Sequence, residues 1–131
     1  MQDLEKILGK YYWENDPIIL GCSTWPDSMY LLYQILETKY AKNLVACYFN
    51  HQLRKESDEE EIFLENMAQE KWFKIEVASA DIKKIRDNFY PSKWIEEVAR
   101  DKRYAFFNAV CNIYETNKVL TAHHLDDKIE T

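Results

Sequence analysis

A short polar loop lies between an apolar stretch and an amphipathic stretch near the start of the chain. It reads Ser23-Thr24-Trp25-Pro26-Asp27-Ser28 and joins residues 17–21 to residues 28–36. A strand, a tight polar loop and a helix in this order form an anion site in α/β proteins, because the first turn of the helix presents unpaired backbone N–H groups and a partial positive charge. The hydroxyls of Ser23, Thr24 and Ser28 would add donors for a phosphate. Asp27 better suits a magnesium ion or an ammonium group.

The tryptophan in this loop conflicts with phosphate binding. Trp25 is the bulkiest kind of residue where a phosphate needs bare backbone, and it resists the positive φ angles of such loops. The loop is not a Walker P-loop, because no Gly-Lys-Ser/Thr sequence follows and the loop holds no lysine. An ordinary helix cap would also place Asp27 and Ser28 here. The loop alone therefore leaves both interpretations open.

Two further clusters carry cationic side chains. His51 and Arg54 follow the apolar run 43–49, although such residues in a loop are usually surface residues. Arg100 and Arg103 are three residues apart in a run with helical periodicity, so they share a face of the helix. Two guanidinium groups on one face could bind a phosphate or a carboxylate in forked geometry. The alternative is an ordinary ion pair between Arg100 and Glu96, which precedes it by four residues.

Residues 123–131 concentrate carboxylates behind the apolar run 118–122. If a helix begins at Leu125, Asp127 and Glu130 share a face, and so do Asp126 and Glu130. Clustered carboxylates suit a hard cation such as Mg²⁺, or a substrate amine. The spacing does not match HExxH, which argues against zinc. A charged helix start is the alternative interpretation.

Periodicity predicts the elements that must position these clusters. We expect strands over 18–21, 43–49, 73–78 and 118–122, helices over 27–40, 57–72, 81–88 and 95–116, and another loop-to-helix transition from 123. Ser57 and Glu60 predict a capping box. Strands alternating with helices predict an α/β fold with a doubly wound parallel sheet. Ligands bind such sheets beyond the carboxyl ends of the strands, where the clusters after residues 21, 49 and 122 would converge.

The composition indicates one domain with one core. The chain has 131 residues, is 47% hydrophobic and carries a net charge of −6, which disfavours binding of nucleic acid over its whole surface. Cys22, Cys47 and Cys111 form no CxxC pair and predict free thiols in a reducing compartment. No signal peptide or apolar run of membrane-spanning length is visible. We therefore expect a cytoplasmic protein without a membrane partner.

Together, the motifs resemble those of the N-type ATP pyrophosphatase, or PP-loop, superfamily, and more closely those of the tRNA(Ile)-lysidine synthetase family. That family shows SGGxDS after a strand, then NHxLR, ExxARxxRY and HHxDDxxET. This chain carries STWPDS at 23–28, NHQLR at 50–54, EEVARDKRY at 96–104 and HHLDDKIET at 123–131. The resemblance covers nearly the whole chain. It implies a Rossmann-like fold of the adenine nucleotide alpha hydrolase kind, with residues 1–131 as an N-terminal ATP-binding domain that is truncated at its C-terminal side and lacks the downstream tRNA-binding domains.

The resemblance implies an ATP-dependent ligase whose substrates are tRNA(Ile) and free lysine. ATP would adenylate the wobble cytidine, and the lysine side-chain amine would then displace AMP. By motif, the resemblance implies ATP binding by Ser23, Thr24, Trp25, Pro26, Asp27, Ser28, His51 and Arg54. It implies catalytic roles for Asp27, Arg100, Arg103, Asp127 and Glu130, and a Mg²⁺ site at Asp27 and Asp127. ATP and Mg²⁺ are the expected cofactors, and the full-length protein could form a homodimer.

Two alternative functions remain open at this point. One is a related PP-loop tRNA thiolase, although thiolases that use a catalytic cysteine or an iron–sulfur cluster need CxxC pairs. The other is an inactive relic that binds nucleotide or tRNA, which applies if Trp25 is genuine.

The tryptophans offer a different explanation for the conflict in the loop. The chain has 4 Trp and 2 Gly, whereas an average usage of about 7% would give roughly 9 glycines. Trp25 and Trp94 stand where the family has or often has glycine, and Trp72 stands where a helix end favours glycine. We hypothesise that these residues are encoded by UGA codons, which the organism reads as glycine. The codon UGG at these positions would contradict the hypothesis.

Overall fold

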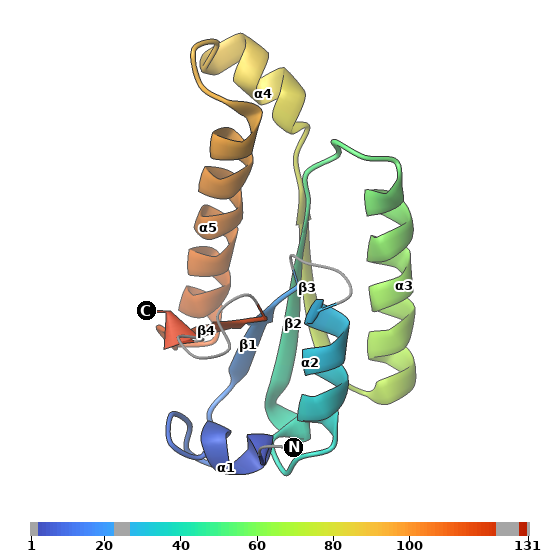
Figure 1. The fold of residues 1–131 in the computed structure, drawn as a ribbon, viewed down its shortest axis with the longest axis vertical. Coiled ribbons are helices and arrows are strands. Elements are labelled where there is room, and N and C mark those ends of the chain that lie inside the picture. Colours follow the sequence, from blue (N-terminus) through green and yellow to red (C-terminus); the bar gives the residue numbers. More distant parts are fainter. Residues whose placement is uncertain (1–2, 23–26, 123–128, 131) are drawn as a thin grey trace.

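The computed structural model describes residues 3–22, 27–122 and 129–130. The elements, in chain order, are α1 (Leu4–Leu8), β1 (Ile18–Gly21), α2 (Asp27–Leu36), the 3₁₀ helix η1 (Ala41–Asn43), β2 (Leu44–Asn50), α3 (Glu56–Lys71), β3 (Lys74–Ser79), α4 (Ile82–Phe89), α5 (Ile95–Ile113), β4 (Val119–Thr121) and β5 (Ile129–Glu130). Helices α2 and α3 cover one face of the sheet, and α5 covers the other (Figure 1).

Four parallel strands form the sheet in the order β3-β2-β1-β4, and β5 pairs with β4 in antiparallel direction. The chain moves from β1 outward to β2 and β3, then crosses to the other side of β1 with β4. The boundary between β1 and β4 is therefore the topological switch point at which parallel sheets bind ligands. This order confirms the predicted α/β fold with a Rossmann-like parallel sheet.

Both faces of the sheet are buried. Ile18 and Leu20 of β1 belong to the apolar cluster that includes residues of α1, α2 and α3, whereas Ile19 between them packs with residues of α5. Successive side chains of a strand point to opposite faces, so a strand covered on both sides must be apolar at every position. This is why the central strands stand out as unbroken apolar runs.

Two helices end earlier than predicted. Helix α2 ends at Leu36 rather than at residue 40, because the Thr38 hydroxyl donates to the Ile35 carbonyl (2.7 Å) and accepts from the Tyr40 N–H (3.1 Å). Helix α5 ends at Ile113 rather than at residue 116. The chain then turns through Glu115 at φ 57°, and the N–H of Thr116 bonds back to the Cys111 carbonyl (3.0 Å).

The predicted capping box at Ser57 is wrong. Helix α3 begins one residue earlier, at Glu56, and the Ser57 hydroxyl is buried with no hydrogen-bond partner within the described residues. The Glu60 carboxylate accepts instead from the Tyr48 hydroxyl (2.8 Å). The side chain of Glu60, which the sequence pattern assigns to the cap, therefore connects α3 to β2 instead.

Strand β5 corrects the predicted helix start near the C-terminus. Ile129 pairs with Leu120 and Glu130 pairs with Val119, so Glu130 lies in a strand. The edge of β4 offers unpaired backbone groups, which another strand can satisfy. The helical spacing that joined Glu130 to Asp127 on one face therefore does not apply to Glu130. Residues 123–128, with Asp126 and Asp127, lie outside the described residues.

Gly21 allows α5 to lie close to the centre of the sheet. A Cβ atom at Gly21 would meet the ring of Phe107 at 2.8 Å. Gly21 also pairs with Cys47 of β2 and with Thr121 of β4, so it lies inside the sheet beside the switch point. Any side chain at this position would displace α5 or distort β1.

Helix α3 ends in a Schellman motif with Trp72 at its left-handed position. The N–H groups of Trp72 and Phe73 both bond to the Ala68 carbonyl, and Trp72 has φ 66° and ψ 42°. Phe73 and Ala68 belong to the same buried cluster, as is usual for this motif. Glycine is preferred at such a position because a Cβ atom is strained there. The prediction that this helix end favours glycine agrees with the backbone geometry.

We expect Trp72→Gly to raise the free energy of unfolding by about 1 kcal/mol, since it removes the left-handed strain of a residue with a Cβ atom. Little packing is lost, because Trp72 is 90% exposed. Urea unfolding followed by circular dichroism measures the change. The matched control is Trp94→Gly, which replaces an exposed tryptophan at φ −71° and should bring a smaller gain, because no left-handed strain is removed there. Equal effects of the two substitutions would contradict the role assigned to the left-handed backbone.

Candidate active site

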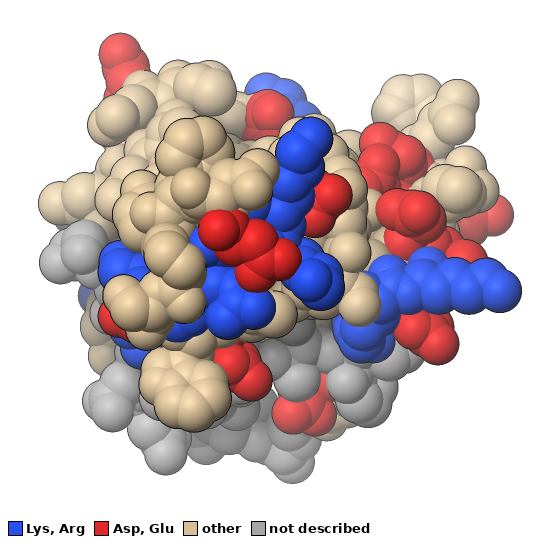
Figure 2. Space-filling view, turned by 90° about the horizontal axis from the view of Figure 1, so that it is seen from above, with Lys and Arg blue, Asp and Glu red and all other residues tan. Residues whose placement is uncertain are grey.

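Three segments reach the same edge of the sheet. Helix α2 begins at Asp27 behind β1, residues 51–54 follow β2, and α5 begins at Ile95, behind β3 and α4. In Figure 1 the carboxyl ends of β2 and β3 point toward the end of the molecule that carries α4. Figure 2 looks onto that end and shows Lys and Arg side chains gathered near its middle, with acidic side chains among and beside them.

Asn50 fixes the loop that follows β2. Its buried side-chain amide donates to Asp58 (2.8 Å) and Glu61 (3.0 Å) in the first turns of α3, and its carbonyl oxygen accepts from the Gln52 N–H (2.9 Å). Gln52 has φ 56°. These bonds hold a tight turn against α3 and determine where the His51 side chain emerges.

Arg54 forms an ion pair with a residue of α3 and does not line the cavity described below. Its guanidinium lies 3.4 Å from the Glu60 carboxylate, which also accepts from the Tyr48 hydroxyl. Burial and the hydrogen bond to Glu60 raise the pKa of Tyr48, so the phenol remains protonated at neutral pH. Arg54 therefore contributes a positive potential near His51, while its own hydrogen bonds are partly used.

His51 lies in a positive environment. Burial lowers its pKa below the usual 6.5, and the charges of Arg54 and Arg103 lower it further, against an opposing effect of Glu60. Its Nδ1 accepts a hydrogen bond from the Leu53 N–H (3.2 Å), which leaves the proton of the neutral ring on Nε2. The ring is thus a neutral donor at physiological pH.

Arg100 and Arg103 line a cavity of about 630 Å³ together with His51, Leu53 and Trp94. Within the described part of the chain, neither guanidinium forms an ion pair, although Glu96 and Glu97 line the same cavity.

The first turn of α5 accounts for the two glutamates. Glu96 and Glu97 lie in that turn, where a negative charge is stabilised by the helix dipole. The predicted alternative, an ion pair between Glu96 and Arg100, is not among the ion pairs of the described residues. The two guanidinium groups are left for an anion.

Asp27 is exposed as the first residue of α2, and Ser28 is buried beside it. The backbone ladder continues to the residue before the loop, because the Cys22 N–H donates to the Cys47 carbonyl (2.8 Å). The other predicted ATP-binding residues of the loop, which are Ser23, Thr24, Trp25 and Pro26, lie outside the described residues, as does Asp127. Among the residues that the structure describes, no three His, Cys, Asp or Glu side chains are grouped to hold a metal ion.

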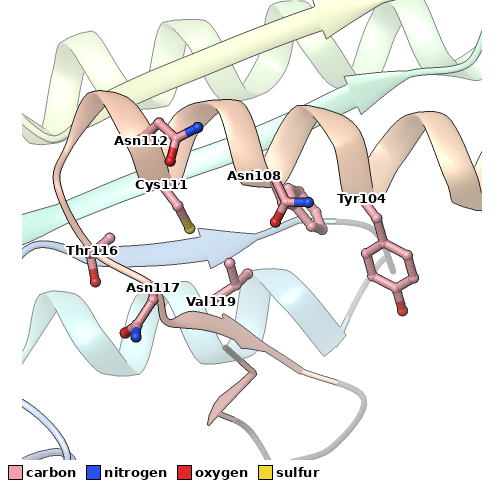
Figure 3. A pocket seen from close by; sticks show the side chains of 8 residues that line it. Tyr104, Asn108, Cys111, Asn112, Thr116, Asn117 and Val119 are labelled. Carbon is pink, nitrogen blue, oxygen red and sulfur yellow. The ribbon is translucent and has the colours of Figure 1, made fainter.

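Another cavity, of about 680 Å³, lies between α5 and β4 (Figure 3). Its lining includes the amides of Asn108, Asn112 and Asn117 and the thiol of Cys111, and none of the described residues that line it is charged. Asn117 precedes β4, so this cavity extends toward the amino end of that strand. A site without cations at the amino end of a strand is poorly suited to a phosphate.

The three cysteines are free, as the sequence predicts, and the structure shows that all three are buried. Burial raises the pKa of Cys22 to about 12, and it also raises the pKa of Cys47 and Cys111. None of these thiols has the lowered pKa of a nucleophilic cysteine.

A parallel α/β sheet with unpaired arginines and a helix start at its carboxyl edge is the architecture of a phosphate-binding domain. The chain belongs to the PP-loop domain family, whose model matches residues 1–131. Among the described residues, no helix is both long and apolar enough to cross a membrane.

Several relatives bear the name tRNA(Ile)-lysidine synthase. The one from Persephonella marina is 35% identical over 121 residues, which are 90% of this chain and 26% of the relative. The one from Staphylococcus aureus strain COL is 38% identical over 120 residues, or 89% of this chain and 27% of the relative. The bifunctional protein TilS/HprT of Listeria innocua is 31% identical over 139 residues and is covered to 21%. The chain thus spans about a quarter of the length of these relatives.

A solved structure shares the fold. It is the U34-tRNA thiolase NcsA from Methanococcus maripaludis with its [4Fe-4S] cluster, with a TM-score of 0.72 at 17% identity, covering 96% of this chain and 45% of the thiolase. At this identity the likeness concerns the fold alone.

Sequence reasoning missed the residues that support the loop after β2. Asn50, Tyr48 and Glu60 hold that loop and Arg54 in place, yet only Asn50 carried a signal, as a polar residue at the end of an apolar run. Glu60 was assigned to the helix cap because its spacing from Ser57 fits that pattern.

We expect the free energy of unfolding to fall as the pH drops below about 6.5, with part of that fall due to His51. The pKa of His51 is lower in the folded protein than in the unfolded chain, so the unfolded chain takes up the proton first as the pH falls. The folded state therefore loses stability between the unfolded pKa of the histidine, near 6.5, and its lower folded pKa. In His51→Gln this part should disappear, while the other two histidines remain. Urea unfolding at pH 8 and at pH 5.5 measures the difference. The same pH dependence in both proteins would contradict the lowered pKa.

Proposed function

We propose that the full-length protein containing this chain joins lysine to the wobble cytidine of tRNA(Ile) in an ATP-dependent reaction. The observation that carries the proposal is the pair of unpaired guanidinium groups of Arg100 and Arg103 at the carboxyl edge of a PP-loop domain. Relatives named tRNA(Ile)-lysidine synthase, 35% and 38% identical, support it.

The proposed reaction has two steps. The C2 oxygen of the cytidine attacks the α-phosphorus of ATP, and pyrophosphate leaves. The lysine ε-amine then attacks C2, loses a proton, and AMP leaves with the oxygen. Negative charge grows on the leaving phosphates in both steps, so preorganised cations and N–H donors nearby lower the barrier.

Different residues would bind the pyrophosphate and the remaining substrate groups. The loop 23–28 at the start of α2 would hold the pyrophosphate through backbone N–H groups and hydroxyls. Arg100, Arg103 and the Nε2–H of His51 would donate to a phosphate or to the lysine carboxylate. Arg54 would act mainly through its charge, because Glu60 already engages its guanidinium.

Asp27 fits a role as a magnesium ligand. Magnesium in phosphate sites keeps several waters and takes one or two protein carboxylates, and Asp27 offers an exposed one at the helix start. Asp127 would be the second. Magnesium, when bound, would neutralise charge on the phosphates. Glu130 remains a candidate for contact with the lysine ammonium group.

A thiolase of the same superfamily is the second enzymatic candidate, and the cysteines of this chain give it no support. Thiolation requires a thiolate or a sulfur-carrying cluster, whereas Cys22, Cys47 and Cys111 are buried. An inactive relic remains the candidate outside the enzymes, and it depends on Trp25.

We expect Arg100→Ala and Arg103→Ala each to lower kcat/KM for lysidine formation by roughly 10²-fold, the usual loss of one preorganised donor. Incorporation of radiolabelled lysine into tRNA(Ile) by the full-length protein measures it. The control is Lys42→Ala, which removes an exposed cation beside the amino end of β2 and should leave the rate unchanged. Full activity in both arginine variants would contradict the proposed site.

We expect Trp25→Gly to tighten Mg·ATP binding by roughly tenfold or more, equivalent to about 1.4 kcal/mol, because it frees the loop for the phosphates. Calorimetry on the full-length protein measures the affinity. Trp13→Gly, which lies before the amino end of β1, is the matched control and should have no effect. Failure of both variants and the parent protein to bind ATP would favour the relic.

A further inference from the structure

The described tryptophans all lie on the surface. Trp13 is 82% exposed, Trp72 90% and Trp94 77%. Within the described residues, none of the three indoles forms a hydrogen bond, a ring contact or a cation–π contact. Tryptophan is usually well buried and contributes much apolar area to a core.

The other aromatic residues of this fold divide between the surface and the core, and seven of them are exposed, such as Phe89 at 72%. Five of them are buried in the apolar clusters, namely Tyr12, Tyr40, Tyr48, Phe73 and Phe107. The core therefore recruits tyrosine and phenylalanine but no described tryptophan. The absence of the largest aromatic side chain from the described core is the contrast that matters.

Each described tryptophan contributes its backbone to a turn or a helix end. Trp72 is the left-handed residue of the Schellman motif after α3. Trp94 is the N-cap of α5, where it makes no side-chain capping bond. Trp13 opens a turn in which its N–H donates to the Asp16 carboxylate (2.8 Å) and its carbonyl accepts from the Asp16 N–H (3.1 Å).

Glycine suits positions 72 and 94 better than tryptophan. It is the preferred residue at the left-handed position and an accepted residue at an N-cap. Gln52 and Glu115 also have positive φ in this fold, so the geometry tolerates other residues with a Cβ atom. The combination of turn geometry, high exposure and missing contacts is what sets the tryptophans apart.

We infer that the codons for Trp13, Trp25, Trp72 and Trp94 are UGA and that the organism reads them as glycine. UGA differs from the tryptophan codon UGG in one base and is assigned to tryptophan in some genetic codes, so the wrong assignment would produce tryptophan at glycine positions. The native protein would then carry six glycines, the two in the sequence plus these four. Position 25 is included because of its loop motif. Position 13 is included because the structure places Trp13 in a turn with an exposed side chain.

A surface for stacking nucleic-acid bases is the main rival explanation for exposed aromatic residues. The positions do not fit one. Trp94 precedes α5 at the carboxyl edge of the sheet, whereas Trp13 and Trp72 precede β1 and β3, at the amino edge. No single face holds all three side chains.

Glycine would also change the candidate active site. Trp94 lines the cavity of Arg100 and Arg103, so glycine there would widen the opening over the guanidinium groups. The inference itself stands on backbone geometry and exposure, and it holds whether or not the protein is a ligase.

The gene sequence and the mass of the native protein test the inference. We expect UGA at codons 13, 25, 72 and 94, and glycine masses in protein isolated from its own organism. Trypsin releases residues 11–39, which contain positions 13 and 25, and residues 94–100. Cleavage after glutamate releases residues 71–76, with position 72. UGG at any of these four codons, or a tryptophan mass in any of these peptides, would overturn it.

Discussion

The contact between Gly21 and Phe107 determines where the cations of the site stand. It fixes the distance of α5 from the centre of the sheet. Arg100, Arg103 and Phe107 follow one another at helical spacing and therefore share a stripe of α5. The helix has 19 residues, about 28 Å, whereas β1 has four. The stripe thus packs on the sheet at Phe107 and passes beyond the strand ends, where the arginines emerge.

Glu96 and Glu97 line the cavity together with Arg100 and Arg103, but the carboxylates of α3 near the loop after β2 are engaged by other groups. Asp58 and Glu61 accept from Asn50, and Glu60 accepts from Tyr48 and Arg54. The charge that matters to a ligand is the local one, and around His51 it is positive. A net charge of −6 is therefore compatible with binding a phosphate or a carboxylate, and binding of a whole tRNA would need other surfaces of the full-length protein.

The sequence was sufficient for the sheet and insufficient for the interactions between elements. The three strands β1, β2 and β3 were predicted within one residue, because burial on both faces makes their apolar runs continuous. Strand β5 was missed, since its pairing with β4 is a long-range contact that leaves no local pattern. Spacing also allowed Arg100 to pair with Glu96 or to remain unpaired, and nothing in the sequence decides between these states. The side-chain positions decide, and among the described residues they form no such pair.

Turn geometry and phosphate-loop chemistry both bear on whether these positions hold tryptophan or glycine. The positive φ at position 72 favours a residue without a Cβ atom, and so would a phosphate-binding loop at 23–28. Divergent evolution of an enzyme would explain a blocked loop, but it would not explain exposed indoles at a helix end, an N-cap and a turn that use the backbone alone. A single cause at the level of the codon accounts for all of them, and it leaves the rest of the PP-loop fold consistent with its sequence.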